Sequence, residues 1–367
     1  MTPSAKTPSA KTTSAKTTSF SVGRAVDWEF AAALGGKLAR PEPPATDYTR
    51  RQAVEQLAES ARASEIPVRE VTGLIEGGEI PEARIVNRPQ WIHAATQSMK
   101  VMTGGADGGA GKPGLISGRI AGAQTAAVLA FVSSGILGQY DPFASGEHGR
   151  GGELLLVYPN VIAVERQLRV VPADFRMWVC LHEVTHRVQF RANPWLADHM
   201  SNSLAVLTEE AADDLTQVVS RLAEYVRERR STAPEPNSAG VLGLLRAVQS
   251  DAQREALDRL LVLGTLLEGH AEHVMDAVGP AVVPTVATIR ARFDQRRRRK
   301  QSPLQRIVRA LLGVDAKMSQ YTRGKAFVDE VVGRVGMARF NAVWTDADTL
   351  PRPAEIDVPQ RWIDRVL

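Results

Sequence analysis

The chain has 367 residues, 44% hydrophobic and 23% charged, with a formal net charge of +4, so it can bury the core of one large domain or of two ordinary ones. Its single cysteine, Cys180, excludes a disulfide-stapled scaffold and a four-cysteine zinc site, so any zinc ion must be held by nitrogen and oxygen ligands. The mildly basic charge is spread along the chain and does not demand an anionic partner.

The chain begins with a five-residue repeat, TPSAK TPSAK TTSAK, and no bulky apolar residue lies between Thr2 and Ser19. Such a segment buries too little apolar surface to offset the entropy cost of ordering. We therefore expect residues 1–22 to form a flexible tail. The tail lacks the apolar centre of a secretory signal, and we expect a cytoplasmic protein.

The next stretches mix helical and loop signals. Residues 49–63 have apolar residues at helical spacing, which predicts a helix. Glycines, a proline and an aspartate predict a loop at 103–114, but not a phosphate loop, because Lys112 is followed by Pro113 rather than by Ser or Thr. Residues 120–140 have no charge but are rich in small residues, which favours a buried, closely packed helix over a membrane span.

The middle of the chain predicts a strand followed by a long helix. The apolar run at 152–161 is preceded by glycines and contains Pro159, which is typical of a buried strand. The segment PADFRMWVCLHEVTHRVQFRA then predicts a helix of about 18 residues that starts near Pro172, is capped by Asp174 and ends before Pro194.

Two further helices are predicted beyond this point. Residues 204–229 are strongly amphipathic, and residues 252–279 form a helical pattern that stops at Gly279 and Pro280. The fold class is therefore predominantly α (α+β), with one small β-sheet around 152–161.

The segment VCLHEVTHRVQF within the long helix contains the pattern His-Glu-x-x-His. Positions four apart lie on one face of a helix, so His182 and His186 can present two imidazoles to one metal ion. Glu183 is placed to act as a general base on a water molecule at that metal, as in metalloproteases. The alternative to a metal site is an ordinary helix whose histidines only form hydrogen bonds. A nucleophilic role for Cys180 is disfavoured, because its apolar neighbours predict a buried, inert thiol.

A catalytic zinc ion needs a third protein ligand. The compact pattern His-Glu-x-x-His-x-x-Gly-x-x-His fails, because Gln189 and Ala192 stand at the glycine and third histidine positions. Glu209 and Glu210 follow in the acidic stretch EEAADD, which we expect to be a solvated face.

The segment LEGHAEHVMD offers the better ligands, because burying so many polar groups in an otherwise apolar helix is costly unless something pairs them. We expect Glu268 to bind the metal and Glu272, four residues on, to accept the outer N–H of a ligand histidine. His270 remains a rival for the third position. Gly269 is expected to allow close approach to the helix of the histidine motif.

These segments, LHEVTHRVQF with PWLADH and then LEGHAEHVMDAVGP, resemble the zincin-like family of actinobacterial zinc-dependent metalloproteases, some of which are labelled coenzyme F420 biosynthesis-associated proteins. The resemblance covers most of residues 115–367. In gluzincins the glutamate of a Glu-Gly-x-Ala segment is the third ligand and an acid four residues on supports it, which Glu268 and Glu272 match. The chain departs from the Asn-Glu variant of this pattern, since Leu267 precedes Glu268. The gap from His186 to Glu268 is also far longer than in the best-known peptidases of this kind.

The resemblance implies a zincin-like fold, with an active-site helix and a second ligand-bearing helix. Residues 23–367 are then expected to be a single zincin-like metalloprotease domain. It would divide into a helical N-terminal part at 23–112, a catalytic core at 113–300 and a helical C-terminal part at 301–367.

The predicted function is a zinc-dependent metallohydrolase, a peptidase, with Zn²⁺ as cofactor and Glu183 as general base. A donor for the developing oxyanion is also needed. Tyr321, His270 and Tyr158 are the candidates for this donor. Of the three, Tyr321 is our predicted catalytic residue.

The expected partner is a peptide or protein substrate, with no membrane and no nucleic acid. Two alternatives stay open. The basic block RARFDQRRRRK at 290–300 could make the chain a metal-binding interaction protein, although a solvated helix end is favoured because no aromatic residues alternate with the basic residues for base stacking. The site could also hydrolyse a small molecule.

Overall fold

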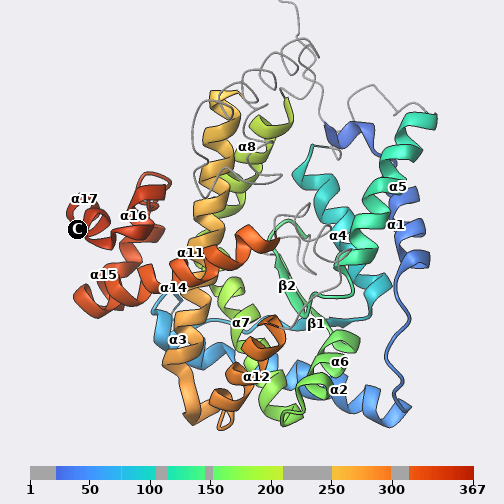
Figure 1. Ribbon diagram of the computed structural model, residues 1–367, viewed down its shortest axis with the longest axis horizontal. Coiled ribbons are helices and arrows are strands. Elements are labelled where there is room, and N and C mark those ends of the chain that lie inside the picture. Colours follow the sequence, from blue (N-terminus) through green and yellow to red (C-terminus); the bar gives the residue numbers. More distant parts are fainter. Residues whose placement is uncertain (1–21, 76, 105–114, 145–151, 210–249, 299–313) are drawn as a thin grey trace, which may run out of the picture.

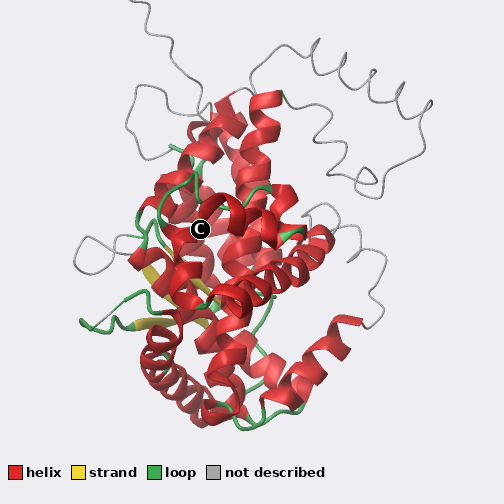
Figure 2. Ribbon diagram, turned by 90° about the vertical axis from the view of Figure 1, so that its left-hand side faces the viewer, coloured by secondary structure: helices red, strands yellow, loops and turns green. Residues whose placement is uncertain are grey.

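The computed structural model describes residues 22–75, 77–104, 115–144, 152–209, 250–298 and 314–367, with the backbone alone at some positions near these limits. Within these ranges helices predominate and the strands form one small sheet (Figure 2). The predicted fold class is therefore confirmed. All but the last residue of the tail expected at 1–22 lies outside the described residues, as do most of the 103–114 loop and most of the 204–229 helix. The division into one domain stays a prediction.

The sheet has three strands, β1 (Ala83–Val86), β2 (Gly138–Asp141) and β3 (Glu153–Val157), in the order β1-β3-β2. Strand β1 is parallel to β3, and β2 is antiparallel to it. Side chains of the central strand alternate: Leu154 and Leu156 enter the larger hydrophobic core, whereas the side chains between and after them enter a smaller core on the other face.

Helices lie on both sides of this sheet and pack against one another (Figure 1). Before the sheet is complete they are α1 (Trp28–Leu38), α2 (Asp47–Ala63), α3 (Glu65–Thr72), α4 (Arg88–Met102) and α5 (Leu115–Val132). After β3 come α6 (Tyr158–Leu168), α7 (Pro172–Ala192), α8 (Trp195–Glu209), α11 (Asp251–Val282), α12 (Val286–Arg298), α14 (Val314–Val335), α15 (Met337–Phe340), α16 (Pro353–Asp357) and α17 (Pro359–Val366). Short 3₁₀ helices lie at Val22–Ala25 and Asn341–Trp344.

The predicted strand at 152–161 is confirmed in its first half only. It ends at Val157, and α6 begins at once with Tyr158 and with Pro159 in its first turn. Proline is favoured there because the first turn of a helix has no use for its missing N–H. Pro159 therefore begins a helix rather than bounding a longer strand.

Helix α7 lies in the middle of the molecule and contacts α2, α3, α11 and β2, so it is buried on nearly every side. It begins at Pro172 and ends before Pro194, as predicted, but Asp174 does not cap it. The Asp174 carboxylate instead accepts hydrogen bonds from the backbone N–H and the hydroxyl of Thr285. It thereby fastens the start of α7 to the segment before α12.

Helix α11 packs along α14, and this is where Gly269 is needed. A Cβ atom on Gly269 would lie 2.2 Å from the carbonyl carbon of Gly324, and the two helices touch backbone to backbone. The expectation that Gly269 makes room for α7 is therefore wrong, since it makes room for α14. The predicted stop at Gly279 is seen as a break, because Gly279 is non-helical with φ of 56° before a last turn.

The small-residue helix predicted in 120–140 corresponds to α5, which packs closely on α1. A Cβ on Gly122 would lie 2.8 Å from the carbonyl oxygen of Asp27, so only glycine allows this approach. One side of α5 is nevertheless exposed, including Ile116 and Ile120, so the helix is not fully buried. Among the described residues, no helix has the length and apolar content that a membrane crossing requires.

Candidate metal centre

The histidine motif lies near the middle of α7, where helical spacing places His182 and His186 one turn apart on one face. Their Nε2 atoms are 3.2 Å apart, so both rings direct the same nitrogen to the same place. The rings are nearly perpendicular, with centroids 4.8 Å apart. The motif therefore presents a preformed pair of imidazole nitrogens.

Helix α11 brings Glu268 to this pair. Its Oε2 lies 3.3 Å from Nε2 of His182 and 3.8 Å from Nε2 of His186. These three residues are the group of potential metal ligands found in the part of the chain that the structure describes, with ligand atoms within 4.8 Å of one another. The three residues predicted as ligands are thus brought together across 82 positions of sequence (268 − 186).

The spacing of these atoms fits a zinc ion. Bonds of about 2.0–2.1 Å at tetrahedral angles separate neighbouring ligand atoms by about 3.3 Å. The separations of 3.2, 3.3 and 3.8 Å agree with three corners of such a tetrahedron. Two nitrogens and one carboxylate oxygen also form the donor set of a catalytic zinc site, which leaves the fourth corner for water or substrate.

The electrostatics of the three side chains follow from their closeness. Burial alone would lower the pKa of His182, but the hydrogen bond and negative charge of Glu268 raise it to about 9. Burial would raise the pKa of Glu268, yet the two histidines hold it well below its usual value. Glu268 is therefore a carboxylate at neutral pH, the form that a cation requires.

Glu183 follows His182 directly but points to a different neighbour. Its side chain lies against Gly138 of β2, where an added Cβ would be 2.6 Å from Cγ of Glu183. The residue is buried, and burial raises the pKa of its carboxyl group above the ordinary value. A carboxylate in this environment binds a proton more readily than one in water, as a general base must.

Gln189 is the residue at this site that the sequence analysis missed. It is fully buried on α7, and its Oε1 lies 2.8 Å from Nδ1 of His186. Its Nε2 lies 3.0 Å from the Leu267 carbonyl oxygen and 2.9 Å from Nδ1 of His270. The available signal was a glutamine three residues after the second histidine, between the apolar residues Val188 and Phe190.

His270, the predicted rival ligand, is not in the group of three potential ligands. It is fully buried, stacked on Phe340 with ring centroids 5.6 Å apart and edge-on to Trp344. Burial, together with the nearby His273 and His186, lowers its pKa to about 3. His270 therefore belongs to the packing behind the site.

Glu272 lies one turn beyond Glu268, but its carboxylate accepts a hydrogen bond from Arg290 at 3.0 Å. Arg290 also pairs with Asp276 at 2.6 Å. A second arginine of the basic block, Arg292, donates to the carbonyl oxygen of Leu168. Part of the 290–300 block thus joins α12 to α11 and α6, while residues 299–300 lie outside the described residues.

The remaining predicted residues are distributed as follows. Tyr321 is in α14, but its side chain lies outside the described residues, so its assignment stays a prediction. The hydroxyl of Tyr158 donates to Glu42, on the segment before α2. Cys180 is fully buried, its Sγ lies 3.7 Å from the Leu57 carbonyl oxygen, and burial raises the pKa of its thiol, as expected of an inert cysteine.

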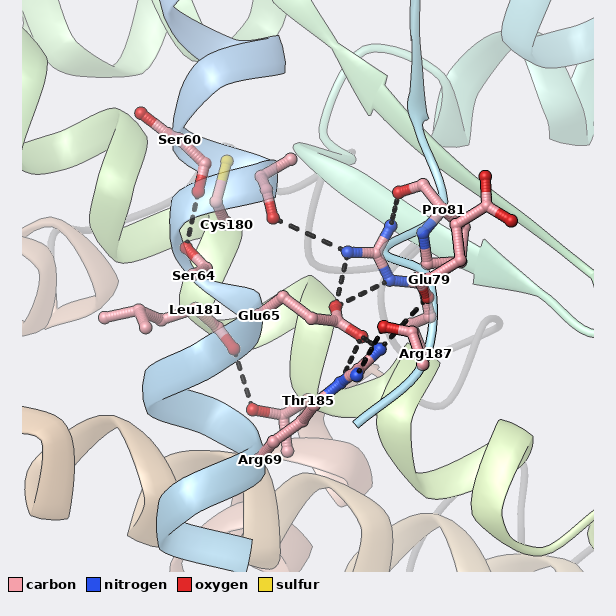
Figure 3. Close-up of polar contacts among 12 residues, drawn as sticks. Ser60, Ser64, Glu65, Arg69, Glu79, Pro81, Cys180, Leu181, Thr185 and Arg187 are labelled. Carbon is pink, nitrogen blue, oxygen red and sulfur yellow. Dashed lines mark hydrogen bonds and ion pairs between the residues drawn. The ribbon is translucent and has the colours of Figure 1, made fainter. Parts of the chain in front are cut away.

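Another side of α7 is held by an ion-pair group that we name the arginine cluster: Glu65, Arg69 and Arg187 (Figure 3). Glu65 of α3 accepts from Arg187 with one oxygen at 2.6 Å and from Arg69 with the other at 2.7 Å. Arg187 also donates to the carbonyl oxygen of Pro81 at 2.8 Å. The cluster therefore ties the ligand-bearing helix to α3 and to the segment that leads into β1.

Comparison with known proteins agrees with this geometry. A family model described as zincin-like metallopeptidase matches residues 26–363. The chain is also similar to a protein from Chloroflexus aurantiacus whose crystal structure is described as a candidate hydrolase with a novel fold. The two are 27% identical, with a TM-score of 0.63 over 93% of this chain and 98% of that one. No protein of curated function matches the chain.

Proposed function

The chain belongs to the zincin-like metallopeptidase family, and from that premise we propose that it is a zinc-dependent peptidase with Glu183 as its general base. The observation that supports this most is the convergence of His182, His186 and Glu268 at the spacing of a tetrahedral zinc site. We also propose that the chain is related, within this family, to the actinobacterial zinc metalloproteases that its motifs resemble.

His182, His186 and Glu268 would hold the ion, which would lower the pKa of a water molecule to about 7 and polarise the substrate carbonyl group. Glu183 would take a proton from the attacking water and return it to the leaving nitrogen. Its burial supports this, because the raised pKa of its carboxyl group favours acceptance of that proton. Tyr321 is proposed as a donor to the developing oxyanion.

A peptide substrate is supported by the position of β2. This strand is at the edge of the described sheet, and its Gly138 touches Glu183. An extended peptide can add to a sheet edge through main-chain hydrogen bonds. The same edge would then bring a peptide bond beside the base.

The interaction-protein alternative is weakened by Arg290 and Arg292, whose guanidinium groups are engaged within the chain. Hydrolysis of a small molecule remains an outcome that the test below can return.

The test compares the zinc-loaded wild type with Glu183→Gln on a peptide library read by mass spectrometry, with zinc content measured by elemental analysis. We expect Glu183→Gln to keep its zinc and to lose turnover by roughly 100-fold or more. Glu255→Gln, at an exposed site on α11, is the matched control and should match the wild type. Full activity of Glu183→Gln would refute the base assignment, and cleavage of small amides but of no peptide would redirect the substrate class.

A further inference from the structure

The two helices that bear the ligands are joined by the side chain of one buried residue, Gln189. It lies on α7 one turn after His186, and its amide contacts α11 at two points. Its hydrogen bonds to His186, to the Leu267 carbonyl and to His270 measure 2.8, 3.0 and 2.9 Å. No other partner is needed, because these contacts use both amide hydrogens and the amide oxygen.

The direction of these hydrogen bonds follows from the Leu267 carbonyl. A carbonyl oxygen can only accept, so the NH₂ end of the Gln189 amide must face it. The amide oxygen then faces Nδ1 of His186, and since that oxygen can only accept, Nδ1 must bear the proton. In neutral imidazole the other nitrogen is then a lone-pair acceptor. For His186 that nitrogen is Nε2, the atom 3.2 Å from Nε2 of His182.

His270 completes the same pattern from the other side. The second amide hydrogen of Gln189 points to Nδ1 of His270, which must therefore accept. The proton of His270 is then on Nε2, and that atom has no hydrogen-bond partner among the described residues. The His270 ring stacks on Phe340 and meets Trp344 edge-on. A buried histidine that takes no part in the proposed reaction thus acquires a role.

We propose that Gln189 is the positioning residue of the metal centre, fixing His186 with its Nε2 lone pair toward the ion, and that Leu267 and His270 fix the direction of the Gln189 amide. This inference rests on the proposed function, because it presumes a metal ion at His182, His186 and Glu268. Outer partners of ligand histidines set tautomer and ring orientation, and their loss typically weakens metal binding by about 10–100-fold.

The first test measures zinc affinity by chelator competition for the wild type and three variants. Gln189→Leu has a similar size but neither accepts nor donates, so zinc affinity should fall by about 10–100-fold. Gln189→Glu still offers His186 an acceptor but can no longer donate to the Leu267 carbonyl or to His270, so its zinc affinity should fall by less than that of Gln189→Leu.

Thr185→Val is the matched control for that experiment. Thr185 is fully buried on the same helix, and its hydroxyl donates to the Leu181 carbonyl oxygen rather than to a metal ligand (Figure 3). It should lose stability but keep its zinc affinity. A merely structural role of Gln189 would make Gln189→Leu behave like Thr185→Val.

The outcomes separate the two proposals. If the wild type binds no zinc, the metal centre itself is refuted. If the wild type and Gln189→Leu bind zinc equally tightly, only the role of Gln189 is overturned. If Gln189→Leu fails to fold, ¹⁵N NMR of the wild-type histidine rings decides. We expect the proton of His270 on Nε2 and that of His186 on Nδ1, and a His270 proton on Nδ1 would reverse the amide and overturn the inference.

Discussion

Two polar groups lie on different sides of the same helix, and they differ in how their hydrogen-bonding capacity is used. In the arginine cluster, both oxygens of Glu65 accept from guanidinium groups, and each arginine also donates to backbone carbonyls. Glu65 and Arg187 are almost completely buried, so every polar atom needs such a partner. We call such a cluster closed, because its polar atoms find their partners within the protein and leave no free donor or acceptor for a ligand.

The metal centre has the opposite arrangement. Two imidazole nitrogens and a carboxylate oxygen converge, and all three can give an electron pair. Without a cation, a proton on His182 offsets this convergence, in agreement with the raised pKa of His182. A closed polar cluster holds the helix in place, whereas an open one is a site for an ion.

The sharpest way to break this comparison is to remove the open cluster's carboxylate. Glu268→Ala should lose stoichiometric zinc by elemental analysis, an effect larger than the roughly 10–100-fold cost of losing an outer partner. His270→Phe, which keeps the aromatic packing, should retain stoichiometric zinc because His270 lies outside the ligand group and the Leu267 carbonyl still orients the Gln189 amide. The reverse result would make His270 the ligand.

The closed cluster should show its effect in stability. Glu65→Ala would leave two buried guanidinium groups without a carboxylate and should cost about 3–5 kcal/mol in the free energy of unfolding. Urea denaturation measures this, and the folded protein should still bind zinc. The exposed pair of Glu82 with Arg62 supplies the control, since Glu82→Ala should cost about 1 kcal/mol or less. Equal costs for the two variants would contradict the distinction.

A third change affects the open site without touching a ligand. Gly138→Ala would place Cβ 2.6 Å from Cγ and 2.9 Å from Cδ of Glu183, so the base must shift. Because misplacement by about 1 Å can cost up to about 100-fold in rate, we expect turnover to fall by about 10–100-fold with zinc retained. Gly333→Ala, where an added Cβ meets nothing within 4 Å, should leave turnover unchanged. Unchanged turnover in Gly138→Ala would show that Glu183 has room to move.

The sequence predicted the open site better than the closed one, for a physical reason. His182, Glu183 and His186 are fixed relative to one another by helical spacing, a local property. Glu268 could be inferred because buried polar groups in an apolar helix need a partner. Glu65 and Arg187 are 122 positions apart, and both residue types are common on surfaces, so nothing local predicts their pairing.

The same limit applies to Gln189 and to two corrected expectations. The partner of Gln189, His270, is 81 positions away, and a glutamine in a helix has no distinctive pattern. The neighbour of Gly269 depended on which helix crosses α11 at that point. The hydrogen-bond partner of Asp174 depended on where the segment before α12 lies. Helix positions followed from local spacing, but the contacts between helices required the packed structure.

The smallest expected effect comes from a closed pair near the C-terminus, in which Glu355 is buried and Arg365 is partly exposed. Burial would raise the pKa of Glu355, but hydrogen bonds from Arg365 and from the Arg352 backbone N–H lower it below the ordinary value. A carboxyl group whose pKa is lower in the folded protein stabilises it above the unfolded pKa, near 4.3, and that contribution disappears as the pH falls through the folded value. Glu355→Gln should therefore cost about 1 kcal/mol at pH 7 and progressively less below about pH 4, measured by urea denaturation across pH. A difference between Glu355→Gln and wild type that stays constant down to pH 2 would mean that the carboxylate charge contributes nothing. The comparison would then hold only for clusters that are fully buried.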